Sequence, residues 1–139
     1  MTDADLVAKK LAQIETFVQQ LRRLARPEEI EADVREERFV EHTLQLAIQA
    51  ALDVASHVAA SERLAEPRTN RELFEILARN GWLPESLVAP LRDMAGFRNV
   101  LVHGYAEVDP RVVRDVVEHR LGDLIAFVNE MRKRLVIKA

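Results

Sequence analysis

The stretch Met94-Ala95-Gly96-Phe97-Arg98-Asn99-Val100-Leu101-Val102-His103-Gly104-Tyr105 decides the fold of this chain. It predicts the last turns of a helix, because apolar residues recur at helical spacing on almost every side. A helix that is apolar nearly all round is typical of a buried position. Arg98 and Asn99 interrupt that apolar surface, and a guanidinium is costly to bury alone. We therefore expect Arg98 to face a polar partner or a solvent-filled cleft, with His103 and Tyr105 nearby where the helix ends.

Helical patterns also fill the segments on either side of this stretch, which predicts a helical bundle. The helix that carries the stretch is expected to begin at Pro84, since proline is favoured at the first helical position. The other expected elements are a helix that ends before Pro27, a second over about Asp33 to Arg63, a short one between the capping box Thr69-Asn70-Arg71-Glu72 and the stop Asn80-Gly81, and one long helix from Pro110 to the C-terminal end.

No segment shows the alternation of a β-strand, and the chain contains only 4 Gly. The expected fold is therefore all-α: an antiparallel up-and-down helical bundle of four main helices plus one short helix. The length of 139 residues suits one domain, so we expect residues 1–139 to form a single helical domain.

The composition excludes several classes of protein. Apolar residues make up 48% and charged residues 31% of the chain, as in a water-soluble globular domain. There is no Cys, which removes disulfides, thiolate catalysis and Cys-based zinc sites. No apolar run is long enough for a membrane span, and the N-terminal residues lack the apolar core of a signal peptide. We therefore expect a cytoplasmic protein that does not contact membranes.

The net charge of −3 argues against a protein that coats nucleic acid by bulk electrostatics, because such proteins are usually basic. A small local phosphate site is compatible with this charge. The sequence has no glycine-rich phosphate loop, no dinucleotide-binding fingerprint and no His-Glu-x-x-His pair. The histidines outside the stretch show no metal-ligand spacing, so we expect neither a metal nor a cofactor.

The residue types at the end of the stretch leave two interpretations open. In the first, Arg98 is a satisfied core arginine and His103 interacts with the helix dipole. In the second, the two residues form a site for phosphate chemistry. The polar side of the second helix also has two interpretations. Gln49 and Asp53 either form a face exposed to solvent, or they line one cleft with Arg98. In such a cleft, the acid would orient the guanidinium.

The octapeptide Arg98-Asn99-Val100-Leu101-Val102-His103-Gly104-Tyr105 resembles the Arg-x4-His-x-Tyr signature of the HEPN superfamily, specifically its HepT-like toxins. The resemblance extends to Leu44–Val58, Arg71–Pro84 and Met94–Tyr105, and so covers nearly the whole chain. It implies a homodimer whose motifs line a cleft between subunits, and a ribonuclease toxin. It also implies a partner, a minimal nucleotidyltransferase antitoxin that inactivates the toxin by transferring AMP to the motif tyrosine, which matches Tyr105.

On this basis the expected function is metal-independent cleavage of RNA at a composite site. His103 is expected to transfer protons, because its ordinary pKa lets both forms exist near neutrality. Arg98 is expected to bind the phosphate and stabilise its developing charge, while Asn99 positions the other two. Asp53 is a further supporting candidate, since many HEPN members carry a polar or acidic residue there. Cleavage needs a base and an acid, and a two-fold dimer supplies two histidines.

Two other functions compete with this one. The chain could be a non-catalytic companion subunit of a nucleotidyltransferase, with Arg98 and His103 only binding a nucleotide. It could also be a structural helical adaptor in which Arg98 stabilises the core. The sequence does not indicate which RNA is cut, or whether tRNA is preferred.

Overall fold

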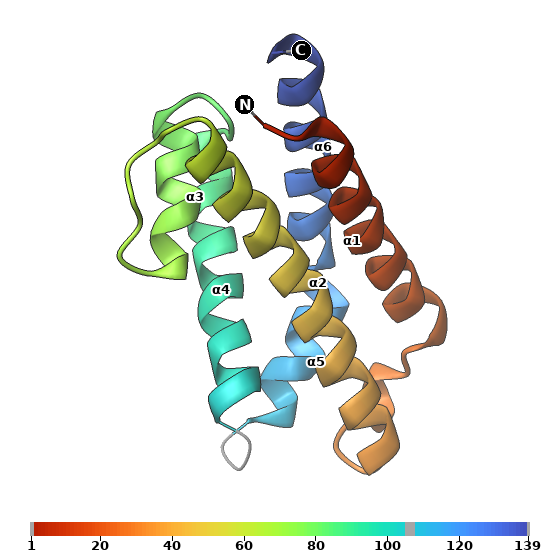
Figure 1. Ribbon diagram of the computed structural model, residues 1–139. Coiled ribbons are helices and arrows are strands. Elements are labelled where there is room, and N and C mark those ends of the chain that lie inside the picture. Colours follow the sequence, from red (N-terminus) through yellow and green to blue (C-terminus); the bar gives the residue numbers. More distant parts are fainter. Residues whose placement is uncertain (1, 105–107, 139) are drawn as a thin grey trace.

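The computed structural model describes residues 2–104 and 108–138, and every regular element in these ranges is helical. The elements in chain order are α1 (Ala4–Leu24), the 3-10 turn η1 (Pro27–Glu29), α2 (Val34–Ser61), α3 (Asn70–Arg79), the 3-10 turn η2 (Glu85–Leu87), α4 (Val88–His103), α5 (Pro110–His119) and α6 (Leu121–Lys138). Figure 1 shows α2 crossing the middle of the bundle, with α1 and α6 on one side of it and α3 and α4 on the other. The all-α bundle expected from the sequence is confirmed.

The core forms where the apolar stripes of these helices meet. On α1 the buried residues recur at spacings of four, three, four and three, and they are Val7, Leu11, Ile14, Val18 and Leu21. The apolar stripe of α2 is buried as well, from Val40 to Val58. Phe74 of α3 and Phe127 of α6 meet edge to face inside this core, with ring centroids 5.8 Å apart. Such stripes give a bundle most of its stability through burial of apolar surface.

The helix that carries the motif begins later than expected. Pro84 has an extended backbone, with φ −70° and ψ 147°, and precedes the 3-10 turn η2. Regular α-helix starts only at Val88 and ends at His103. The proline therefore introduces a tighter turn ahead of the helix, which moves the start by one turn but leaves the motif on α4.

The single long helix expected after Pro110 is wrong, because the chain breaks at Arg120 into α5 and α6. The apolar residues Val113, Val117 and Leu121 follow each other at four-residue steps, and each step rotates a stripe by about 40°. On a straight helix, the last residues of the stripe would therefore face a different direction from the first ones. In the structure α5 packs against α2 and η1, whereas α6 packs against α1.

The start of α3 also differs in detail from the expected capping box. Thr69 precedes the helix but makes no side-chain cap hydrogen bond. Glu72 instead accepts the backbone N–H of Arg68, with Oε2 3.2 Å from the nitrogen. The expected stop is confirmed, since α3 ends at Arg79 and Gly81 adopts a φ of 79°, which glycine accepts at no steric cost.

Within the described ranges, none of the helices combines the length and the apolar character that crossing a membrane requires.

Candidate active site at the end of α4

The last two turns of α4 carry three of the residues expected to form a site. His103 is the final residue of α4 and is exposed, and Asn99 one turn earlier is exposed too. Arg98 is half-buried, on the side of the helix that also carries the core residues Leu91 and Met94. The stretch thus changes from core to surface where the motif lies.

The guanidinium of Arg98 is only partly satisfied. Its Nη1 donates to Oδ1 of Asn99 at 3.2 Å. Its Nε is buried and has no hydrogen-bond partner among the described residues. A buried N–H without an acceptor costs about 1–3 kcal/mol. Among the described residues, Nε of Arg134 on α6 is buried and unpaired in the same way. The guanidinium of Arg98 is thus not fully paired, and its outer N–H groups are the donors that could bind an anion such as phosphate.

Asp53 lies on α2, and its carboxylate binds residues other than Arg98. Oδ2 is 3.4 Å from Nζ of Lys10 on α1, and Oδ1 accepts from Nε2 of Gln49 at 2.8 Å. In the part of the chain that the structure describes, no hydrogen bond or ion pair joins Asp53 to Arg98. Asp53 therefore helps hold α1 against α2, and a supporting role at the site stays a prediction.

A groove beside the end of α4 was not expected from the sequence. It has a volume of about 560 Å³ and is lined by Val34, Glu37, Arg38, Glu41, His42, Gln45, Leu101 and Val108. Burial raises the pKa of Glu41, and the neighbouring Glu37 adds to this effect while Arg38 opposes it. Leu101 is two residues before His103, so the groove adjoins the motif. The sequence signal was the polar side of the second helix, where His42 and Gln45 lie at helical spacing.

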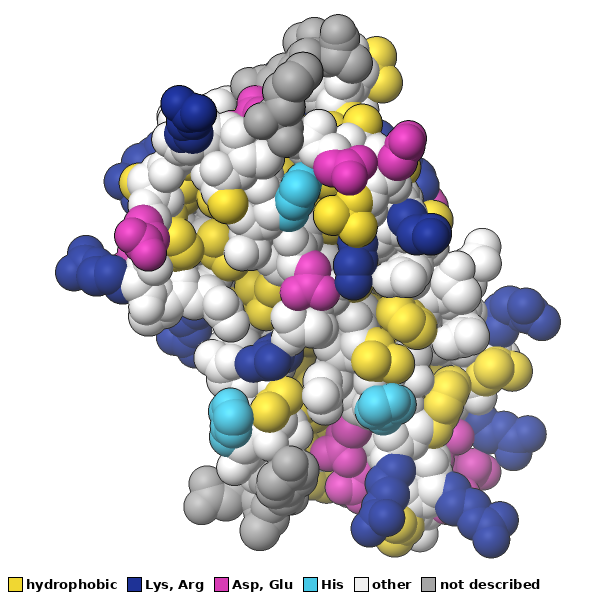
Figure 2. Space-filling model, viewed as in Figure 1, with side chains coloured by type: hydrophobic (Ala, Val, Ile, Leu, Met, Phe, Trp, Pro, Cys, Tyr) yellow, Lys and Arg dark blue, Asp and Glu magenta, His cyan; other side chains and the backbone are white. Residues whose placement is uncertain are grey.

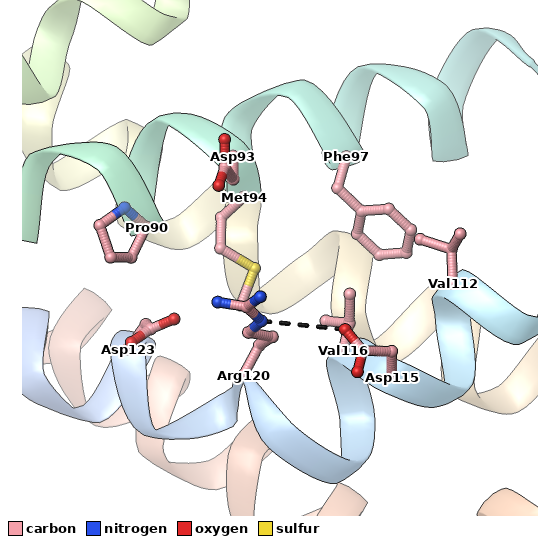
Figure 3. Close-up of a pocket in the computed structure, with 9 residues that line it drawn as sticks. All are labelled: Pro90, Asp93, Met94, Phe97, Val112, Asp115, Val116, Arg120 and Asp123. Atoms are coloured by element: carbon pink, nitrogen blue, oxygen red, sulfur yellow. Dashed lines mark ion pairs between the residues drawn. The ribbon is translucent and has the colours of Figure 1, made fainter.

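A second cavity, of about 180 Å³, lies between α4, α5 and the start of α6 (Figure 3). Its apolar wall is formed by residues of α4 and α5, with Phe97 and Val112 facing each other in the close-up. Three carboxylates, Asp93, Asp115 and Asp123, line it against a single guanidinium, and that guanidinium is 3.8 Å from Asp115. Excess negative charge repels phosphate, so this cavity is a poor site for RNA.

The remaining histidines do not form a second centre of this kind. His57 accepts the backbone N–H of Asp3 through Nε2 at 3.0 Å and so helps to start α1. His119 is exposed at the end of α5, and its imidazole makes no hydrogen bond to another described residue. Among the described residues, no group of three or more His, Asp or Glu side chains is placed to hold a metal ion. The expected modification residue, Tyr105, lies outside the described residues.

Figure 2 shows the face on which α2 and α4 are exposed. Acidic, basic, histidine and apolar side chains are interspersed over the part of this face that is described, without a broad basic field. This pattern agrees with the net charge of −3. Any phosphate contact on this face therefore depends on individual arginines.

The chain is similar to known proteins along nearly its whole length. A family model described as HepT-like, ribonuclease HepT-like, matches residues 8–131. The mRNA nuclease HepT of Shewanella oneidensis is 28% identical over 129 residues, which are 92% of this chain and 97% of that protein. The tRNA nuclease HepT of Aphanizomenon flos-aquae is 30% identical over 98 residues, which are 70% of this chain and 67% of that protein.

The bundle is also similar to a solved toxin. The tri-AMPylated Shewanella oneidensis HEPN toxin, in complex with an MNT antitoxin, superimposes with a TM-score of 0.85 at 28% identity. The match covers 96% of this chain and 99% of that one, so the two proteins share the arrangement of helices from end to end.

Proposed function

The chain belongs to the family of HepT-like ribonucleases, and from this premise we propose that it is the toxin of a toxin–antitoxin pair and cleaves RNA at the end of α4. Residues 1–139 act as a single domain in this proposal. The observation that carries it is the half-buried Arg98, whose Nε lacks a partner among the described residues, on the same helix end as the exposed His103.

The proposed reaction needs no metal. The 2′-hydroxyl of the RNA attacks the adjacent phosphate, the bond from phosphorus to the leaving 5′-oxygen breaks, and a cyclic phosphate remains. A neutral imidazole accepts the proton of the 2′-hydroxyl, and a protonated one donates to the leaving oxygen. Arg98 binds the phosphate and stabilises the charge that builds on it. Asn99 supports this role by holding Nη1 of Arg98 through Oδ1.

We further propose that the working unit is a homodimer. Each chain contributes one motif histidine, whereas the reaction uses one base and one acid. A two-fold axis near the ends of the two α4 helices would supply both. Val100, which is 43% exposed beside Asn99, and Leu46 of α2, which is 37% exposed, provide apolar surface that a second subunit would cover.

The partner in this proposal is a minimal nucleotidyltransferase that adds AMP to Tyr105. Its support is the similarity to the tri-AMPylated HEPN toxin, which was solved with its MNT antitoxin. An added phosphate next to Arg98 would occupy the position of the RNA phosphate and repel the substrate. Intact mass measured after coexpression with the partner should show added AMP units, and Tyr105→Phe should abolish them. A Tyr105→Phe chain that still gains AMP would remove this residue from the role.

The central experiment is RNA cleavage in EDTA by the parent and by His103→Ala. Removing a general acid or base lowers the rate by on the order of a hundredfold or more, so His103→Ala should be inactive while keeping the parent's circular dichroism and melting temperature. His119→Ala is the matched control, because His119 is likewise an exposed histidine at the last position of a helix. It should cleave as the parent does.

Each other result has a clear meaning. A folded His103→Ala that cleaves like the parent would end the proposed mechanism. A parent that binds nucleotide tightly but yields no RNA products would indicate the nucleotide-binding companion subunit instead.

A further inference from the structure

The side chain of Arg71, from the first turn of α3, lies directly on the backbone of α4 at Gly96. A Cβ atom at position 96 would stand 2.8 Å from Cζ and 2.9 Å from Nε of Arg71, and closer still to Nη2. Real Cβ atoms do not approach other atoms so closely. Glycine at 96 therefore creates the space in which this guanidinium rests on the helix.

Gly96 belongs to the same side of α4 as the exposed part of the motif. At 3.6 residues per turn, positions 96, 100 and 103 fall within about 60° of one another around the helix axis. Position 103 is two turns beyond position 96, or about 10 Å along the axis. Figure 1 shows α3 beside only the first part of α4, whose last turns extend past the start of α3. Because the Arg71 guanidinium meets α4 at Gly96, it lies at the near end of the strip that runs through Val100 to His103.

The charge of Arg71 is not compensated in the described part of the chain. The two carboxylates nearest to it in α3 are engaged by other arginines. Glu72 is 3.4 Å from Nε of Arg68, and Glu75 pairs with Nη1 of Arg92. The guanidinium of Arg71 itself forms no hydrogen bond or ion pair with any described residue, and the side chain is exposed.

We propose that Arg71 is a substrate-binding residue that holds an RNA phosphate next to the scissile one. This inference rests on the proposed function and extends the site from α4 onto α3. An arginine offers a fork of donors that suits a phosphate, and Gly96 leaves the space in which this one rests against α4. The RNA backbone then follows the strip on α4, with one phosphate at Arg71 and the reacting phosphate farther along at His103.

The first test compares Arg71→Gln with Arg79→Gln in steady-state cleavage of the RNA that the parent cuts. Arg79 is the matched control, since it is also an exposed arginine of α3 but lies at the opposite end of that helix. Because Arg71 binds a phosphate that does not react, its loss should raise KM by on the order of tenfold and change kcat by less than about twofold. Arg71→Lys should recover part of the affinity, as it keeps the charge.

The second test measures how binding depends on salt, with a fluorescein-labelled single-stranded RNA of mixed sequence and His103→Ala as the non-cleaving background. Removing one phosphate contact to a single strand reduces the slope of log affinity against log salt by about 0.7. The Arg71→Gln variant should show this reduction, and the Arg79→Gln variant should not.

Gly96→Ala gives a third and independent test. The new methyl group meets the far end of a flexible side chain, so Arg71 can move aside and the helix gains a better helix former. The melting temperature should equal or exceed the parent's, while KM rises as in Arg71→Gln. The double variant should be no weaker than either single variant, because both act through the same contact.

The outcomes separate this inference from the proposed function. A parent that cleaves no RNA overturns the proposed function, and this inference with it. A parent that cleaves, with Arg71→Gln indistinguishable from Arg79→Gln in KM and in salt slope, overturns the role of Arg71 alone. Additive losses in the double variant would also overturn it, since they would mean that Gly96 acts by another route.

Discussion

Arg98 is the residue at which folding and function place opposite demands on one side chain. Its Nε is buried without an acceptor among the described residues, and Asn99 receives one N–H of the same group. Burial of an unpaired N–H costs free energy, so the protein keeps this arginine at the expense of stability. A trade of this kind is common where a polar group serves a ligand.

Replacing Arg98 by Met should therefore separate the two demands. Methionine is unbranched and of similar reach, so Arg98→Met should leave the free energy of unfolding equal to or above the parent's. RNA cleavage should fall by on the order of a hundredfold or more, because the phosphate loses its charged partner. Urea unfolding and cleavage assays on the same sample check both. A large loss of stability with cleavage intact would restore the structural interpretation of Arg98.

At the scale of the elements, an ion pair joins the first and last helices of the bundle. Arg132 of α6 donates to the Glu15 carboxylate of α1 through two nitrogens, at 2.8 and 2.5 Å. Hydrogen bonding to Arg132 holds the pKa of Glu15 below its usual range, against the opposing effect of burial. The pair is partly exposed, so solvent screening limits its contribution to less than about 1 kcal/mol.

Glu15→Gln should lower stability by that small amount at neutral pH, measured by urea unfolding at pH 7 and at about pH 3. A depressed pKa means that the stabilisation is present above the unfolded-state pKa of Glu15. It disappears as the pH falls through the folded-state value. The difference between the parent and Glu15→Gln should therefore be smaller at the lower pH. Glu118→Gln removes a pair within α5 alone and serves as the control. A difference that is equally large at low pH would show that packing, not charge, is responsible.

At the scale of the whole molecule, the proposed mechanism requires a second subunit to complete the site. If both histidines of a dimer act on one phosphate, a dimer with one His103→Ala chain is inactive. After exchange of subunits in an equal mixture of parent and His103→Ala, about one quarter of the dimers are fully parental. The mixture should therefore retain about one quarter of the activity of the same total amount of parent.

Self-contained sites would instead retain about one half, and that result would exclude the composite site. Sedimentation equilibrium of the same samples should give twice the mass of the 15.9 kDa chain. A monomer at the concentrations used for cleavage would contradict the dimer directly.

The sequence by itself determined the helical class, the positions of the buried stripes and the place of Arg98, Asn99 and His103 on one helix end. These follow from periodicity and from turn residues, which are local properties of the chain. The family was readable for the same reason, because its motif occupies eight consecutive residues.

Only the tertiary structure decided which side chains meet across helices. In the structure, Asp53 pairs with Lys10 and not with Arg98. The last helical segment breaks at Arg120, because the apolar stripes of α5 and α6 pack against different neighbours. It also placed Arg71 on Gly96, residues that are 25 positions apart in the sequence. Such contacts depend on how far one helix is shifted along its neighbour. Many core contacts together set this shift, and a local sequence pattern does not predict it.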